Sequence, residues 1–196
     1  MSELKFATRL NSFASGAYLY WPELKGKPTV LQMIERAGKV EGLTHLDLNY
    51  PQHMCDDIKT MRRAIEDAGL AVNGMQMRWD APQFRIGAFT HPDAKIRREA
   101  IELTKRGIDT GREFGSRLMT LWMGQDGFDY CFQADYKKIW EDAVGAVREI
   151  AEYAPDIDIS IEYKPNEPRA FSIFPNVTTC LLAVEEAGAP NLGITL

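Results

Sequence analysis

Residues 161–169 read IEYKPNEPR, and this stretch decides the fold. It completes an apolar, alternating run that begins at Ile157, which predicts a buried strand with Glu162 and Lys164 on one face. Pro165 and Pro168 then fix the backbone of the segment that leaves the strand. A buried strand that ends in charged side chains and a stiff loop indicates a parallel sheet with its functional groups at the carboxyl ends of the strands.

The same unit recurs along the chain: a short apolar strand, a polar loop, an amphipathic helix, and then the next strand. The helices carry apolar residues at a 3.6-residue spacing, whereas several strands are apolar nearly throughout. This alternation predicts parallel βα units. The predicted strands lie near 5–11, 43–49, 72–77, 118–123, 157–163 and 192–196, and the predicted helices near 31–37, 58–68, 90–114, 136–154 and 177–187. The third of these helices opens with Thr90-His91-Pro92-Asp93, which fits a capping box.

The loops after the strands favour a closed (β/α)8 TIM barrel over an open doubly wound sheet. The first strand–helix junction, NSFASGAYLYW at 11–21, has no GxGxxG pattern, and the chain has no Walker motif. We count about five βα units and a sixth strand, whereas a closed barrel has eight units. We therefore expect residues 1–196 to form a single TIM-barrel domain that is truncated at its C-terminus, because an open parallel edge leaves backbone groups unpaired.

The composition is that of a soluble globular protein, with 45% hydrophobic and 26% charged residues. The net charge of −5 and the lack of long Lys/Arg runs argue against a nucleic-acid-binding protein. Cys55, Cys131 and Cys180 form no CxxC pair, which favours free thiols in a reducing compartment. No run has the length of a membrane span, and the start lacks the apolar segment of a secretory signal. We expect a cytoplasmic protein that binds neither nucleic acid nor membrane.

Glu162 and Lys164 are the strongest candidates for chemistry. A carboxylate inside a barrel must be paired, protonated or bound to a metal. One interpretation is an ion pair between the two residues and their neighbours. The other is a hard-cation ligand with a lysine beside it that polarises a carbonyl oxygen, and spacing alone does not choose between them.

Other polar and aromatic residues lie at predicted strand ends. Trp122 begins the segment WMGQDG and offers an apolar face for a sugar ring, although a core tryptophan is the simpler interpretation. Asp47 in the second strand and His53 in the loop after it are candidate acids or bases, and a structural role fits His53 equally well. Arg78 ends the third strand and could also line the mouth of the barrel.

These motifs resemble those of a known family. EYKPNEPR at 162–169 resembles the fifth-strand motif of xylose isomerase and related sugar isomerases, in which Glu-x-Lys-Pro-x-Glu-Pro closes the strand. WMGQDG at 122–127 resembles the family's fourth-strand Trp-Gly-Gly motif, and residues 87–115 are similar to its third loop and helix. LDLNYPQH at 46–53 is similar to the second strand of the wider xylose isomerase-like TIM-barrel superfamily. The resemblance covers nearly the whole chain.

The resemblance implies a divalent cation, most often Mn²⁺, with Mg²⁺ or Co²⁺ as alternatives. It assigns Glu162 as a metal ligand, with the remaining ligands after Leu196, and Lys164 as a donor to the substrate carbonyl. It places Trp122 and Phe89 beside the substrate. Asp47 and His53, which the resemblance does not assign, are further candidates for substrate binding. It also implies a cis peptide bond at Glu167–Pro168.

The function that this resemblance implies is a metal-dependent sugar isomerase or epimerase that assembles as a homo-oligomer. The pattern WxGQDG…FQxDY at 122–136 also resembles C-glycoside deglycosidases, which eliminate an aglycone from an oxidised sugar and work with a small partner subunit. A non-catalytic carbohydrate-binding barrel is a further alternative. The endonuclease IV branch of the superfamily is disfavoured by the charge and by the presence of only three histidines.

Overall fold

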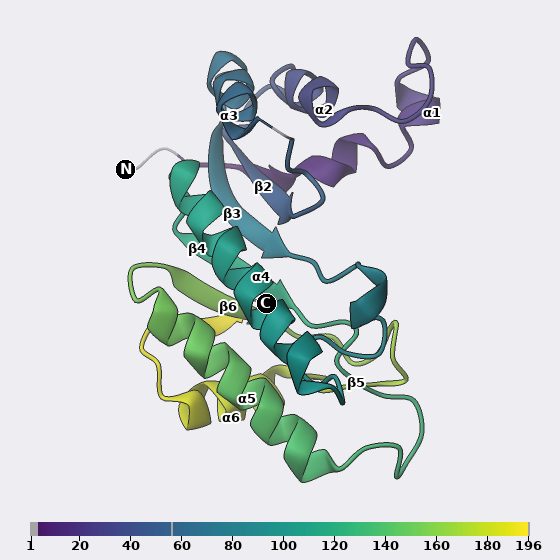
Figure 1. The fold of residues 1–196 in the computed structure, drawn as a ribbon. Helices are drawn as coiled ribbons and strands as arrows, with labels where there is room; N and C mark the ends of the chain where they lie inside the picture. The colour runs from purple at the N-terminus through teal and green to yellow at the C-terminus, as the bar shows by residue number, and fades with distance from the viewer. Residues whose placement is uncertain (1–3, 56, 196) are drawn as a thin grey trace.

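The computed structural model describes residues 4–55 and 57–195 (Figure 1). Within these residues the main sheet has six parallel strands that pair in chain order, as in the first part of a barrel. The predicted alternation of strands and helices is therefore confirmed. The last residue of the sixth predicted strand, Leu196, lies outside the described residues. The strands are β1 (Ala7–Arg9), β2 (His45–Tyr50), β3 (Ala71–Met77), β4 (Leu118–Trp122), β6 (Asp158–Glu162) and β8 (Leu192–Thr195).

The helices lie around the outside of the curved sheet (Figure 1). They are α1 (Ala17–Tyr20), α2 (Val30–Ala37), α3 (Ile58–Asp67), α4 (Ala94–Glu113), α5 (Tyr136–Tyr153) and α6 (Val177–Ala187). Two short 3₁₀ helices, η1 (Leu10–Phe13) and η2 (Pro82–Phe84), follow β1 and β3. Each of the five longer helices begins after a residue whose side chain accepts a backbone N–H of the first turn, which stabilises a helix by about 1 kcal/mol.

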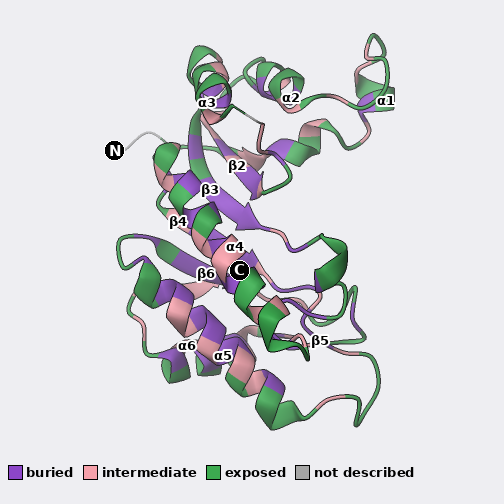
Figure 2. Ribbon diagram, in the orientation of Figure 1, coloured by how far each residue is buried: buried purple, intermediate pink, exposed green. Residues whose placement is uncertain are grey.

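The core lies between the sheet and the helices, and Figure 2 shows the strands largely in the colour of buried residues. Alternate strand residues such as Met75, Leu121 and Ile159 are fully or almost fully buried there. The residues between them face the other way, to the inner side of the sheet. The inner side carries polar groups: Thr120 and Ser160 are hydrogen-bonded at 3.0 Å, and Thr195 donates to Ser160 at 2.7 Å. The inner face of the sheet is therefore the polar face on which a site can form.

The start of α4 differs from the sequence prediction. The run Thr90-His91-Pro92-Asp93 predicted a capping box that begins at Thr90, but the helix begins at Ala94 and Asp93 is its N-cap. Thr90 instead donates through its hydroxyl to Asp126 at 2.8 Å. The Thr90 side chain, which the local pattern assigned to the helix end, is therefore used in a tertiary hydrogen bond.

A second, two-stranded antiparallel pair joins two loops at the carboxyl side of the sheet. It consists of β5 (Gly127–Phe128) and β7 (Phe171–Ser172). A Cβ on Gly127 would lie 2.0 Å from the Phe171 carbonyl oxygen, so this close approach requires glycine. Within the described residues, no helix is long and apolar enough to cross a membrane.

Candidate active site at the carboxyl ends of the strands

Glu162 ends β6 on the inner face of the sheet, and its partner is an arginine from the first strand. Arg9 Nη2 lies 2.8 Å from Glu162 Oε2 and 3.4 Å from Gln76 Oε1. The two charged side chains are 36% and 29% exposed, so the pair is partly desolvated but accessible. Arg9 thus spans the inner face from β1 to β6. Glu162 is therefore ion-paired, as one interpretation of the sequence expected, but with Arg9, whereas Lys164 pairs with Glu167.

Lys164 follows two residues after Glu162, and its Nζ lies 3.0 Å from Glu167 Oε2. Glu167 is 75% exposed in this pair, and such surface pairs contribute little to stability. The ammonium group also lies 5.4 Å from the centre of the Trp122 ring, within range of a cation–π contact. Lys164 can therefore exchange its partner for a ligand at low cost. The Glu167–Pro168 bond is cis, as the resemblance implied.

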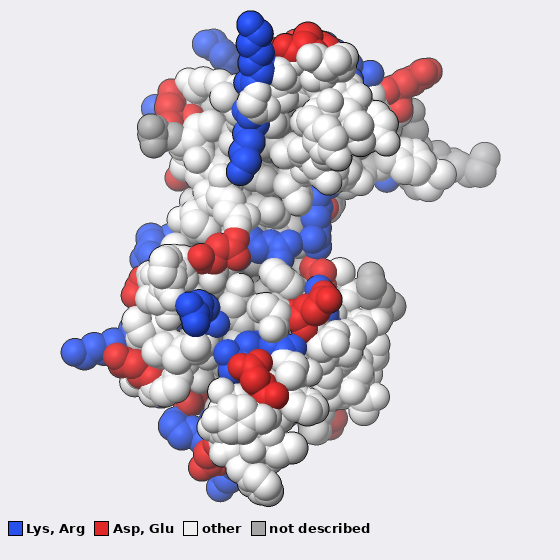
Figure 3. Space-filling view, turned by 90° about the vertical axis from the view of Figure 1, so that its right-hand side faces the viewer, with Lys and Arg blue, Asp and Glu red and all other residues white. Residues whose placement is uncertain are grey.

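Trp122 ends β4 next to Glu162 of β6, in the same register position. Its ring approaches the backbone of Gly124, where a Cβ would lie only 2.6 Å from it. The Arg78 guanidinium lies over the ring at 4.5 Å from its centre. We call these five residues, Arg9, Arg78, Trp122, Glu162 and Lys164, the strand-end cluster. Figure 3 shows basic and acidic side chains together across the hollowed waist of the molecule.

His53 is 5% exposed in the loop after β2. Its Nδ1 accepts the backbone N–H of Asn49 at 2.9 Å, so the neutral ring carries its proton on Nε2. Burial, with the positive charge of Arg78 as a second cause, lowers the pKa of His53 from 6.5 to about 4. His53 is thus a neutral imidazole near Arg78, and its expected role in substrate binding stays a prediction.

Two other candidates form no hydrogen bond or ion pair with the strand-end cluster, although Asp47 pairs in register with Arg9. Asp47 lies in the middle of β2, where its Oδ1 accepts the side-chain amide of Asn73 at 2.8 Å. Phe89 is fully buried and its ring packs edge-on against Trp79 at 4.8 Å. Phe89 therefore lies in the core of this structure, and its expected place beside the substrate stays a prediction.

Asp126 holds the loops around the cluster together. Its Oδ1 accepts the backbone N–H groups of Ala88 and Thr90, at 3.0 and 2.7 Å, and the Thr90 hydroxyl. Its carbonyl oxygen accepts the N–H of Ile173 at 3.0 Å. Burial raises the pKa of Asp126. This one residue links the loops that follow β3, β4 and β6.

The sequence analysis missed Arg9 and Asp126. Arg9 is a single basic residue in a three-residue strand, and its partner is 153 positions away in the chain. The available signal was its place at the carboxyl end of the first strand. Asp126 lies within the WMGQDG motif, but nothing in the motif shows that its carboxylate is buried.

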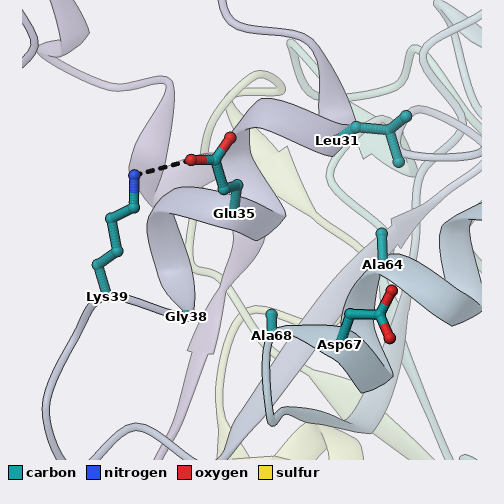
Figure 4. A pocket seen from close by; sticks show the side chains of 7 residues that line it. All are labelled: Leu31, Glu35, Gly38, Lys39, Ala64, Asp67 and Ala68. Atoms are coloured by element: carbon teal, nitrogen blue, oxygen red, sulfur yellow. Dashed lines mark hydrogen bonds and ion pairs between the residues drawn. The ribbon is translucent and has the colours of Figure 1, made fainter.

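Two hollows of about 390 Å³ lie outside the cluster. One lies between α2 and α3 and is rimmed by the Glu35–Lys39 ion pair, as Figure 4 shows. Its floor is a close contact of small residues, since a Cβ on Gly38 would lie 2.9 Å from Ala68 Cβ. The other lies between the loop after β3 and the start of α5, and Arg169 lines it. Neither is formed by residues of the strand-end cluster.

Glu162 fits a divalent cation as one ligand. No hydrogen bond or ion pair within the described residues engages its Oε1, which leaves a hard carboxylate oxygen on the inner face. The described residues nevertheless bring no three His, Cys, Asp or Glu side chains together to hold a metal. A divalent site here needs further oxygen or nitrogen ligands from elsewhere.

A family model described as "Xylose isomerase-like TIM barrel" matches residues 37–196. The chain belongs to this family. It is 28% identical over 146 residues to a xylose isomerase of Thermus thermophilus, a match that covers 72% of this chain and 38% of the relative. The chain thus spans well under half the length of that relative.

Solved structures share the fold at low identity. A 3-keto-D-glucoside 4-epimerase from E. coli has a TM-score of 0.75 at 12% identity, and the match covers 98% of this chain and 67% of that one. A D-psicose 3-epimerase from Clostridium cellulolyticum H10, solved with D-tagatose, has a TM-score of 0.67 at 19% identity. That match covers 97% of this chain and 62% of the epimerase chain. These matches support the partial TIM barrel that the strand order shows.

Proposed function

We propose that the protein is a sugar isomerase or epimerase that acts on the carbon next to a carbonyl group. The observation that carries the proposal is the strand-end cluster, which joins a carboxylate, an ammonium group and an aromatic ring around one accessible face. The names of the matched relatives, a xylose isomerase and sugar epimerases, support the same reaction class.

Four of the five residues of the cluster have a role in this proposal. Lys164 donates a hydrogen bond to the carbonyl oxygen, where negative charge develops during reaction. Trp122 packs against the apolar face of the sugar. Arg9 orients the Glu162 carboxylate. A divalent cation such as Mn²⁺ on Glu162, with further ligands that the described residues do not supply, would polarise the same carbonyl.

The first test is Lys164→Met in the full-length protein, assayed by NMR on a panel of aldoses and ketoses with added Mn²⁺. We expect turnover to fall by about 100-fold or more, the size of effect when one donor to a developing oxyanion is lost. Lys137→Met removes an 84% exposed lysine of α5 and serves as the control, with unchanged turnover. Equal turnover by both variants, or no conversion of any sugar, would refute the proposal.

Two further measurements address the cation and the hydrogen transfer. Bound Mn²⁺ after dialysis should be lost in Glu162→Gln, and its retention would remove Glu162 from the metal site. In D₂O, deuterium in the carbon–hydrogen bonds of the product would indicate proton transfer through an ene-diol, whereas its absence would indicate a hydride shift.

A further inference from the structure

The described part of the chain supplies no ion-pair partner to Arg78. It follows β3 directly, and its backbone N–H is held by the Tyr50 carbonyl oxygen at 2.9 Å. The guanidinium is half-buried, yet no described carboxylate lies within ion-pair distance of it, and no side-chain hydrogen bond holds it. A partly buried charge without a partner is costly, so such groups in proteins are normally paired.

The nearest charges do not neutralise it. The carboxylate of Glu162 is already engaged by Arg9. Burial is the largest cause that lowers the pKa of Arg78, and repulsion by Arg9 is the second, ahead of the opposing attractions of Glu162 and of Asp80 taken one at a time. His53, close by, is neutral over the physiological range. Arg78 therefore lies beside a second positive charge, and no carboxylate of the described residues forms an ion pair with it.

The Arg78 guanidinium is also held in one orientation. It lies over the Trp122 ring at 4.5 Å from the centre, a cation–π contact that fixes the planar group without using its N–H donors. A fixed guanidinium with free N–H groups suits bidentate binding of a carboxylate or a phosphate. Trp122 is also the residue that faces the sugar in the proposed function.

The geometry points to Arg78 as the residue that binds an anionic group of the substrate, so that the substrate is a sugar bearing a carboxylate or a phosphate. This inference rests on the proposed function, because it concerns the same site. In this assignment, Arg78 binds the charged end of the sugar, and Lys164 donates a hydrogen bond to the carbonyl oxygen of the sugar.

The test compares three hexoses that differ only at C6: D-glucose, D-glucuronate and D-glucose 6-phosphate. Their dissociation constants are measured by calorimetry on the full-length protein, on Arg78→Gln and on Arg78→Lys. The control is Arg85→Gln, which removes an exposed arginine from the loop after β3. Thermal unfolding of each variant checks that it is folded.

We expect one charged hexose to bind at least 10-fold more tightly than D-glucose, and the identity of that hexose distinguishes a carboxylate from a phosphate. The preference should vanish in Arg78→Gln, persist in part in Arg78→Lys and remain in Arg85→Gln. Equal binding of all three hexoses, no binding of either charged hexose, or a preference that survives Arg78→Gln would overturn the inference. Conversion of neutral sugars alone would overturn it while leaving the proposed function intact. Binding through Arg78 without turnover of any sugar would support the inference and overturn the proposed function.

Discussion

At the residue scale, His53 should make stability depend on pH. Its pKa falls from 6.5 to about 4 on folding, so the folded protein binds fewer protons than the unfolded chain between these values. The stabilising contribution is complete above pH 6.5 and is lost as the pH falls towards 4, by up to about 3 kcal/mol. Denaturant unfolding at several pH values should show this slope.

The pH dependence of stability is attributed to the His53 ring alone, so a substitution of His53 should remove it. His53→Asn keeps an acceptor for the Asn49 N–H but does not titrate. The control is His91→Asn. The Nδ1 atom of His91 also accepts a backbone N–H, from Asp93, but this bond is exposed, so the substitution should leave the slope unchanged. If His53→Asn kept the slope and His91→Asn lost it, the assignment to His53 would be wrong.

The same scale shows which site residues the sequence could reveal. Glu162, Lys164 and Trp122 were placed correctly at strand ends, because alternation along a strand fixes both face and position. Phe89 is fully buried, and its expected contact with a substrate stays a prediction, because an aromatic residue in a loop can face either the core or a ligand. Arg9 was missed: its position at the end of the first strand was visible in the sequence, but its pairing with Glu162 depends on the curvature that brings β1 opposite β6.

At the element scale, Asp126 should control the order of the loop after β3. Asp126→Ala leaves two buried backbone N–H groups and one hydroxyl without an acceptor. We expect the free energy of unfolding to fall by about 3 kcal/mol, given a cost of about 1–3 kcal/mol for each unsatisfied buried group. Hydrogen exchange at Ala88 and Thr90 should accelerate.

Asp126→Asn separates acceptor geometry from charge. It keeps Oδ1 as an acceptor and removes the cost of a buried charge, which is the cause of the raised pKa of Asp126. We expect its stability to lie within about 1 kcal/mol of the native value. Glu141→Ala, which removes an exposed carboxylate of α5 whose ion-pair partner Lys137 is itself 84% exposed, should cost less than about 1 kcal/mol. If Asp126→Asn and Asp126→Ala lowered the free energy of unfolding equally, the charge of Asp126, and not its acceptor geometry, would hold the loops.

Elements were predictable where one periodic pattern dominated. The 18 residues of α5 were predicted to within one residue, because the apolar stripe and the Asp135 cap agree. The β5–β7 pair was not predicted, because two residues on each strand carry no periodicity. Thr90 misled the prediction for α4, because a cap is a local preference of about 1 kcal/mol that a buried hydrogen-bond network outweighs.

At the scale of the whole molecule, the described sheet has two edges. β1 pairs only with β2 and β8 only with β6 within the described residues, whereas a closed barrel has no edges. Unpaired parallel edges are templates for association with another chain. Residues 1–196 produced alone should therefore self-associate, and sedimentation should show a mass that rises with concentration.

Two lysine variants identify the surface through which association occurs. Gly193→Lys places a charge on the edge strand β8, where an added Cβ meets no atom within 4 Å, and should weaken association. Leu181→Lys places the same charge on α6, where Leu181 and Leu182 are 53% and 55% exposed, and should leave association unchanged. If only Leu181→Lys prevented association, the apolar surface of α6 would be the cause, because hydrophobic contacts rather than open backbone groups would then hold the copies together. A monomer at all concentrations would show that the twist and the short length of β1 already protect the edges.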